Sequence, residues 1–203
     1  LVDEVEADDI ISYICRYSQY KDKEKVIVSS DKDFFQLLDD NTILYRPVQK
    51  VIHNRKSIIE EYGIHPNNFA LARAVVGDKS DNLDGVPGIG LKTISRRFPF
   101  FSEERDIFLK ELVKFCNNQE SKLKAYRSIP DNEQLIMDNY ELMQLYSPSL
   151  SVQTKKSIDW TIDEFEFVFR KTDTNVMMLQ DGINEINWSS LFEDFNRIQR
   201  DNK

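Results

Sequence analysis

The segment VVGDKSDNLDGVPGIGLKT, residues 75–93, decides how the rest of this 203-residue chain is interpreted. It starts at the end of an apolar stretch that is predicted to be a buried helix, and it continues with Asp78 and Asp81. On a helical turn, side chains three positions apart face the same way, and hard divalent cations such as Mg²⁺ prefer carboxylate oxygens. The two aspartates are therefore a candidate pair of metal ligands.

The same segment continues into a glycine-rich hairpin, GVPGIG, at residues 85–90. Glycines permit positive φ angles and close approach of the backbone, and amides at the start of the next helix are expected to point at a phosphate. Such contacts follow the sugar-phosphate backbone without reading the bases. The residues assigned to DNA contact are Gly85, Gly88, Gly90, Lys92 and Arg96. An ordinary glycine-rich turn with solvated aspartates is the alternative, because short glycine motifs often match by chance.

Two further groups of acids lie upstream of this segment. Glu6, Asp8 and Asp9 open a predicted amphipathic helix, where acids would also suit the helix dipole. Asp31 and Asp33 follow the β-branched run at residues 25–30, which is predicted to be a buried parallel strand. Open α/β sheets place their ligands at such strand ends, although a helix N-cap is the alternative for Asp31. These acids are candidate metal ligands together with the later pair.

The composition is that of a globular protein, with 40% apolar and 31% charged residues. The net charge of −8 is unusual for a protein that binds nucleic acid, but residues 85–97 contain three bases and no acid. Cys15 and Cys116 are isolated thiols without the spacing of metal ligands. No apolar run approaches the roughly 20 residues of a membrane span, and the start is unlike a signal peptide, so we expect a cytoplasmic, intracellular protein.

The predicted architecture is an α/β fold in three parts. Residues 1–77 are expected to form a partial parallel-sheet core that carries the acids, with strands at 25–30, 42–47 and 50–53. Residues 78–147 are expected to form a helical region that binds DNA. Residues 148–203 form an acidic, aromatic tail, which is expected to be helical and to pack back on the domain.

Four motifs in register resemble the 5′-nuclease family, which comprises flap endonucleases, bacteriophage 5′→3′ exonucleases and ribonucleases H, and the 5′-nuclease domain of bacterial DNA polymerase I. The motifs are VEADD at 5–9, SSDKD at 29–33, GDKSDN at 77–82 and GVPGIGLK at 85–92. The resemblance covers residues 2–97. It implies a PIN-like parallel-sheet core, followed by a helix-hairpin-helix motif that grips duplex DNA.

The resemblance also implies a set of site residues and cofactors. The implied metal ligands are Glu6, Asp8, Asp9, Asp31, Asp33, Asp78 and Asp81, of which Asp8, Asp31, Asp33 and Asp78 are expected to carry catalysis through the bound metal. Two or more Mg²⁺ ions are expected, with Mn²⁺ as a substitute and K⁺ at the hairpin. Two metals about 3.5 to 4 Å apart would supply an activated water and stabilise the leaving oxygen.

The chain departs from the family pattern before Glu6, where the family has a first strand with a ligand aspartate and a basic helical arch. The expected function is a structure-specific 5′ nuclease of replication or repair, acting on DNA with a 5′ end, flap or nick, or on an RNA–DNA hybrid. A phage-type enzyme in an infected bacterium is favoured. The chain is expected to be either the C-terminal portion of a longer or split protein or a truncated product, and a separate polypeptide that supplies the N-terminal portion is one hypothesis. The alternative is a non-catalytic clamp on duplex DNA, and an acidic α/β domain unrelated to DNA is the third hypothesis.

Overall fold

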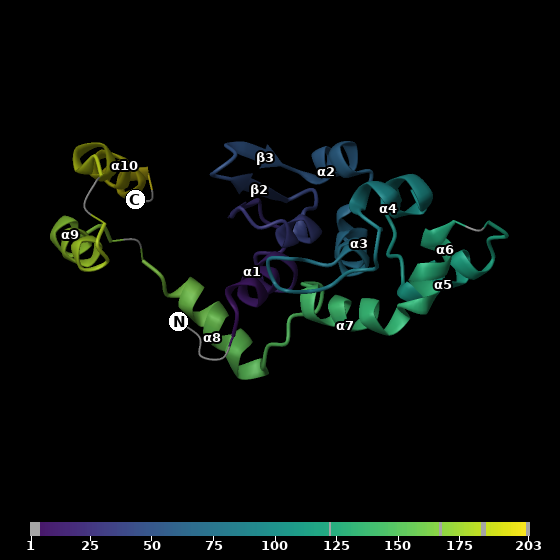
Figure 1. Ribbon diagram of the computed structural model, residues 1–203. Coiled ribbons are helices and arrows are strands. Elements are labelled where there is room, and N and C mark those ends of the chain that lie inside the picture. Colours follow the sequence, from purple (N-terminus) through teal and green to yellow (C-terminus); the bar gives the residue numbers. More distant parts are fainter. Residues whose placement is uncertain (1–4, 122, 167, 184–185, 202–203) are drawn as a thin grey trace. The chain divides into compact units, whose positions relative to one another are not determined.

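The computed structural model describes residues 5–121, 123–166, 168–183 and 186–201 (Figure 1). The chain divides into two compact units, residues 1–156 and 157–203, and each is described by itself. The expected divisions after residues 77 and 147 stay predictions. Within the described residues, every helix is too short or too polar to cross a membrane.

A three-stranded sheet lies at one side of the first unit, in the order β1-β2-β3. β1 (Lys25–Val28) pairs with β2 (Thr42–Arg46) in parallel, with Val26 opposite Ile43, which confirms the predicted parallel pairing. β3 (Val51–His53) is antiparallel to β2, because a short turn at residues 47–50 returns the chain directly. The sheet is therefore mixed.

The prediction that β1 is a buried strand is wrong for one of its two faces. Ile27 is 6% exposed, whereas Val26 and Val28 are 60% and 65% exposed. Successive side chains of a strand point to opposite faces, so only the face that carries Ile27 packs against the core in the described part of the chain. The apolar run predicted a strand correctly, but it did not predict which faces are covered.

Helices make up most of the first unit, and one continuous cluster of apolar side chains, from Cys15 to Leu145, forms its core. Its α-helices are α1 (Ala7–Arg16), α2 (Arg55–Tyr62), α3 (Phe69–Val76), α4 (Leu91–Arg97), α5 (Leu109–Asn117), α6 (Lys124–Asp131) and α7 (Glu133–Met143). A further helix, α8 (Val152–Asp163), crosses the division after residue 156. Three 3₁₀ helices join them: η1 (Asp33–Leu37), η2 (Pro66–Asn68) and η3 (Pro99–Ser102). The helix for which Asp31 was the alternative N-cap is η1, a 3₁₀ helix whose N-cap residue is Lys32.

α3 is the central helix of this unit, as the prediction of a buried apolar helix required. It packs against α7, α4, η1 and η2, and six of its eight residues are buried. Arg73 is its only charged residue. The helix ends at Gly77, whose φ of +78° is available mainly to glycine, and this end delivers Asp78 to the loop beyond.

Two buried amides tie α7 to the elements that carry acids. The Asn139 side-chain amide donates to the carbonyls of Ala74 and Asp84, at 3.0 and 2.9 Å. The Gln36 side-chain amide donates to the carbonyl of Met143 at 3.0 Å, and its oxygen accepts from the amide of Leu145 at 2.7 Å. Because buried polar groups need partners, these bonds fix where α7 ends relative to α3 and η1.

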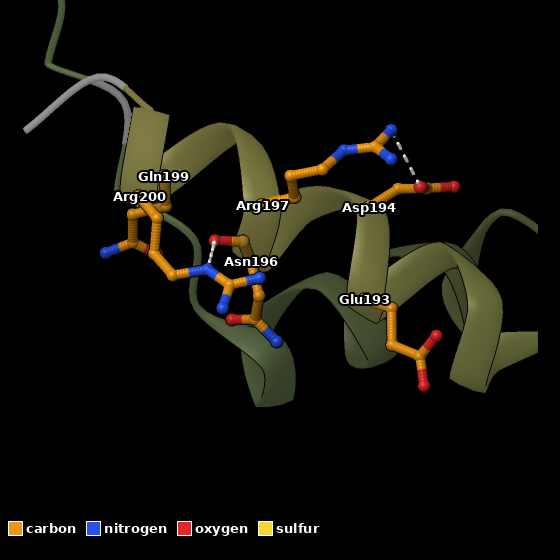
Figure 2. Close-up of a pocket in the computed structure, with 6 residues that line it drawn as sticks. All are labelled: Glu193, Asp194, Asn196, Arg197, Gln199 and Arg200. Atoms are coloured by element: carbon orange, nitrogen blue, oxygen red, sulfur yellow. Dashed lines mark hydrogen bonds and ion pairs between the residues drawn. The ribbon is translucent and has the colours of Figure 1, made fainter.

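The second unit contains α9 (Lys171–Gln180) and α10 (Trp188–Asp201). Its aromatic side chains form a small cluster, in which the rings of Phe169 and Phe195 stack at 5.0 Å and Trp188 lies 5.6 Å from Phe192. An open hollow of about 790 Å³ follows α10 (Figure 2). Its lining comes from this one helix, and Arg197 pairs with Asp194 at 3.1 Å, so it resembles a solvated helix face more than a binding site.

Candidate metal centre

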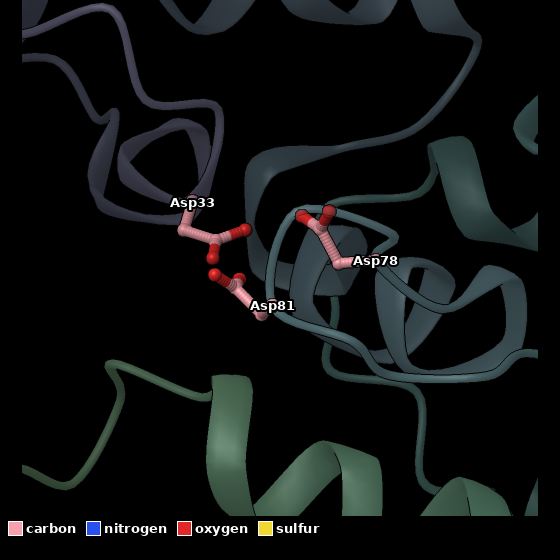
Figure 3. Close-up of side chains that lie close together, drawn as sticks. All are labelled: Asp33, Asp78 and Asp81. Atoms are coloured by element: carbon pink, nitrogen blue, oxygen red, sulfur yellow. The ribbon is translucent and has the colours of Figure 1, made fainter.

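Three aspartates from two separate segments come together beside α3. Asp33 starts η1, and Asp78 and Asp81 lie in the loop that follows α3. Each offers a carboxylate oxygen, and these oxygens all lie within 4.8 Å of one another. Figure 3 shows the carboxylates of Asp33 and Asp81 turned toward each other, with Asp78 beside them. The juxtaposition predicted from sequence is therefore present for these three acids.

The loop that carries Asp78 and Asp81 is not the helical turn that the spacing suggested. Asp78 and Leu83 form an isolated antiparallel bridge, with amide-to-carbonyl distances of 2.9 and 2.7 Å. The bridge closes a tight loop, in which Asn82 adopts a φ of +58°. Gly77 ends the helix one residue before Asp78, so the spacing of three brings the two carboxylates together through loop closure.

Two glycines hold this loop against the end of α3. A Cβ atom on Gly85 would lie 1.8 Å from the Val76 carbonyl oxygen and 2.6 Å from the Gly77 nitrogen. A Cβ atom on Gly77 would lie 2.4 Å from the Gly85 nitrogen. Since these neighbours are backbone atoms, only glycine allows the approach. Gly85 therefore has a structural role, whatever its part in binding DNA.

The strand-end acids occupy different environments. The Asp31 carboxylate accepts from the amide of Asp33 at 2.9 Å, and Asp31 is exposed. Burial raises the pKa of Asp33 to about 6; the Asp31 and Asp78 charges also raise it, while Arg73 opposes the shift. Within the described residues, the three-acid group includes Asp33 and not Asp31.

The N-terminal acids face the same region. Glu6 is the N-cap residue of α1 but its side chain makes no capping hydrogen bond, so capping does not account for it. Burial raises the pKa of Asp8, and the nearby charges of Asp31, Glu6, Asp9 and Asp81 raise it further. Burial and the Glu6 charge raise the pKa of Asp9 in the same direction. Three segments of the chain therefore contribute acids to one electrostatically coupled region.

A pocket of about 200 Å³ lies among these acids, and sequence reasoning missed one of its carboxylates. Glu6, Asp8, Asp9 and Asp33 line it together with Glu141 near the end of α7. Nothing in the spacing of Glu141 indicates a ligand, because it stands in an ordinary amphipathic helix. Only the fixed position of α7 brings it to the pocket.

Sequence reasoning also missed Arg73, whose guanidinium lies between two of the predicted ligands. Its Nε donates to Asp33 Oδ1 at 3.2 Å, and an Nη donates to Asp78 Oδ2. A basic residue in an apolar helix, five positions before Asp78, was the available signal. Burial acts to raise the pKa of Asp78, but hydrogen bonds from Ser80 and the Arg73 charge outweigh it and hold that pKa below its usual value.

The predicted hairpin forms a turn between the acidic loop and α4. The amide of Ile89 donates to the carbonyl of Val86 at 3.1 Å, and Gly88 has a φ of +82° after Pro87, the pattern of a type II turn. Gly90 is the N-cap of α4, and a Cβ atom added to it would have nothing within 4 Å. Lys92 and Arg96 are exposed on α4, so both are accessible to a ligand.

The residues present fit a hard divalent cation. Three carboxylates offer oxygen donors at mutual distances that one ion can span, and Asp81 is exposed while Asp33 and Asp78 are partly buried. Oxygen-only donor sets suit Mg²⁺, Mn²⁺ and Ca²⁺. Asp78 is already engaged by Arg73 and Ser80, so binding there requires a rearrangement of donors.

Comparisons with known proteins find similarity to 5′–3′ exonucleases. The family described as 5′–3′ exonuclease, N-terminal resolvase-like domain, matches residues 1–63. A 5′–3′ exonuclease of Buchnera aphidicola from Schizaphis graminum is 33% identical over 172 residues, covering 83% of this chain and 55% of the relative. A 5′–3′ exonuclease of Aquifex aeolicus is 26% identical over 96% of this chain and 60% of the relative. The chain thus spans a little over half the length of these relatives.

Solved structures share the fold. A T5 5′-exonuclease with bound zinc ions superposes with a TM-score of 0.67 and 21% identity, covering 80% of this chain and 60% of that chain. The bacteriophage T5 flap endonuclease, in a complex with DNA and metal ions, superposes with a TM-score of 0.64 and 20% identity over the same shares of the two chains. The family profile over residues 1–63, the two named exonucleases and the shared fold support the 5′-nuclease family for this chain.

Proposed function

We propose that this chain carries the metal-binding acids and the DNA-binding turn of a structure-specific 5′ nuclease that depends on Mg²⁺. The observation that supports this most is the meeting of Asp33, Asp78 and Asp81 within 4.8 Å, because they come from segments more than 40 residues apart. Relatives are named as 5′–3′ exonucleases, and one solved structure of this fold contains DNA and metal ions.

The proposed chemistry is hydrolysis of a phosphodiester bond. Bound divalent ions would supply an activated water and stabilise charge on the leaving oxygen. Asp33, Asp78 and Asp81 would hold the ions on one side, and Asp8, Asp9, Asp31 and Glu6 would complete the set from α1 and the strand end. Because burial raises the pKa of Asp33 to about 6, metal binding below that pH would release a proton from this carboxyl.

The proposed DNA contact is the turn before α4, acting as the helix-hairpin-helix element of the family. Gly88 and Gly90 leave the backbone open there, and Lys92 and Arg96 stand exposed beside them. Such a surface would grip phosphates without reading sequence. Backbone carbonyls at the turn are proposed to hold K⁺. The substrate is proposed to be DNA with a 5′ end, flap or nick, or an RNA–DNA hybrid, in cytoplasmic replication or repair.

Cleavage of a 5′-labelled flap duplex tests the proposal directly. The chain is assayed with Mg²⁺, Mn²⁺ or EDTA, and compared with an Asp78→Asn, Asp81→Asn double variant. Asp84→Asn is the matched control, because Asp84 is an exposed acid in the same loop outside the three-acid group. We expect metal-dependent cleavage that the double variant loses and the control keeps. Cleavage that persists in the double variant would rule out the assigned acids.

The alternative function is a clamp that binds duplex DNA without cutting it. The exposed bases of α4 support this alternative, because they are independent of the metal centre. Binding without cleavage, weakening steeply with salt and lost in a Lys92→Ala, Arg96→Ala variant, would favour the clamp. Absence of both binding and cleavage would reject both functions for this chain.

A further inference from the structure

Arg73 lies among the acids of the candidate metal site and contacts two of them. It is the only charged residue of α3, and its side chain is 12% exposed. Its two partners are similarly enclosed, since the side chains of Asp33 and Asp78 are 15% and 13% exposed. A guanidinium stays protonated in proteins, so this region holds a permanent positive charge between two of the acids.

Both carboxylate oxygens of Asp78 accept hydrogen bonds. Oδ2 accepts from Arg73, while Oδ1 accepts from the amide of Ser80 at 2.8 Å and from the Ser80 hydroxyl at 2.5 Å. Asp33 Oδ1 accepts a hydrogen bond from the same guanidinium. A divalent ion that binds Asp78 through Oδ2 therefore competes with the Arg73 donor for the same oxygen. The ion would also lie close to a buried cation of the same sign, which it repels.

Arg73 has a second effect in the absence of metal. Three carboxylates within 4.8 Å of one another repel, and a single guanidinium contacting two of them offsets part of that repulsion. Removing the partner of a buried charge is costly, so the guanidinium and the two carboxylates stabilise one another. The same contacts that assemble the site therefore oppose the arrival of a divalent ion.

We propose that Arg73 is the resident cation of this site: it competes with divalent metal for Asp33 and Asp78, and it moves off Asp78 when metal binds. The proposal rests on the metal site of the proposed function and adds a residue that sets its affinity. Arg73 acts here as a positioning residue, since it works through the carboxylates. The guanidinium would then be left beside the loaded site.

Binding of Mn²⁺ to the metal-free chain tests the competition without an activity assay. Isothermal titration calorimetry is done on the wild type, Arg73→Gln and Arg73→Lys, with far-UV circular dichroism to verify folding. We expect Arg73→Gln to bind Mn²⁺ about tenfold more tightly, or by roughly 1.4 kcal/mol. Arg73→Lys, which keeps the charge, should stay near the wild type. Equal or weaker binding by a folded Arg73→Gln variant would overturn the proposal.

A double-mutant cycle shows whether Arg73 acts through Asp78. In an Asp78→Asn background, the effect of Arg73→Gln on Mn²⁺ affinity should shrink to about twofold, because the main point of competition is gone. An undiminished effect would contradict displacement from Asp78. If neither the wild type nor Arg73→Gln binds Mn²⁺, the metal site and this inference both fail. If the wild type binds and Arg73→Gln is unchanged, this inference alone fails.

A measurement on the wild type covers the case in which Arg73→Gln does not fold. The arginine Nε–H signal of Arg73, identified by its loss in Arg73→Lys, is followed by nuclear magnetic resonance during titration with Mg²⁺. Amides of the loop at residues 78–83 report binding in the same spectra. We expect the Arg73 signal to shift together with these amides. A loop that responds to Mg²⁺ while the Arg73 signal stays still would refute displacement.

Discussion

Replacing Gly85 by alanine should detach the acidic loop from α3. The new Cβ atom would lie 1.8 Å from the Val76 carbonyl oxygen and 2.1 Å from the Val76 carbonyl carbon. Both are main-chain atoms in the last turn of a buried helix, so no side-chain rotation relieves the clash. The loop therefore has to move away, and its own hydrogen bonds are lost with it.

The expected magnitude follows from those bonds. The amide of Val86 donates to the carbonyl of Val75 at 2.8 Å, and Asp78 and Leu83 exchange two bonds of 2.9 and 2.7 Å. At roughly 0.5 to 1.5 kcal/mol each, losing all three costs about 2 to 4 kcal/mol of the free energy of unfolding. Overpacking of a rigid site independently costs about 1 to 3 kcal/mol. Gly85→Ala should thus destabilise the first unit by roughly 3 kcal/mol.

Two other glycines of the same turn provide matched controls. Gly88 has a φ of +82° but no backbone atom near its Cβ position, so Gly88→Ala should cost only the strain of about 1 to 2 kcal/mol. Gly90 has a φ of −122° and open space, so Gly90→Ala should change the free energy of unfolding by less than about 0.5 kcal/mol. We therefore predict that Gly85→Ala destabilises the first unit most, Gly88→Ala less and Gly90→Ala least.

The assay has to report on the first unit. Trp188 lies in the second unit, and Trp160 lies on α8, which crosses the division after residue 156, so tryptophan fluorescence does not report on the first unit alone. Urea unfolding is therefore followed by far-UV circular dichroism, with hydrogen exchange of peptides that cover residues 69–90. If Gly85→Ala proves as stable as Gly90→Ala, the close approach of the loop to α3 is not a constraint, and the reasoning is refuted.

Three further predictions test other parts of the structure. Asn139→Ala should lower the free energy of unfolding by about 2 to 3 kcal/mol in urea titrations, because two buried carbonyls lose their donor. Burial raises the pKa of Asp33 to about 6, and a metal ion binds the ionised carboxylate. The affinity for Mn²⁺, measured by calorimetry, should therefore fall about tenfold per pH unit below pH 6. An affinity that stays constant from pH 5 to 7 would contradict this. Burial raises the pKa of Cys15 and Cys116 to about 11, so both thiols should react with a disulfide reagent at pH 8 only after unfolding.

Local sequence signals predicted which helices and strands form better than they predicted what packs against them. The β-branched run of β1 and the apolar run of α3 were both identified, because propensity and periodicity are properties of the segment itself. The exposure of Val26 and Val28 was not, because it depends on what lies against the sheet. Burial of a strand face depends on tertiary packing, so the sequence of the strand predicts it only in part.

At the site too, the sequence predicted several residues correctly but did not predict the structure around them. Asp78 and Asp81 were correctly predicted to lie together, but for the wrong reason, since a β-bridge and a positive φ replace the helical turn. Arg73 and Glu141 were not predicted as site residues, because each lies in a helix whose sequence pattern gives no sign of a site. Their positions depend on long-range contacts such as those of Asn139, which no spacing rule anticipates.

Asp33 and Asp78 show why such environments matter for how the site works. Both carboxylates contact the guanidinium of Arg73, yet the pKa of Asp33 is raised and that of Asp78 is lowered. The difference arises because burial dominates at Asp33, whereas Ser80 adds two donors to Asp78. Below pH 6 a proton therefore resides on Asp33, while Asp78 stays ionised and bound to Arg73.

This asymmetry has a consequence for binding DNA. At neutral pH the three carboxylates and Arg73 carry about two negative charges, and the acids of α1 and the strand end add to them, so the site repels phosphates that the exposed bases of α4 would attract. Each divalent ion bound there would offset two of these charges. Under the proposed function, DNA affinity should then rise when metal fills the site, even for a variant that cannot cleave, because metal binding and DNA binding would be thermodynamically coupled.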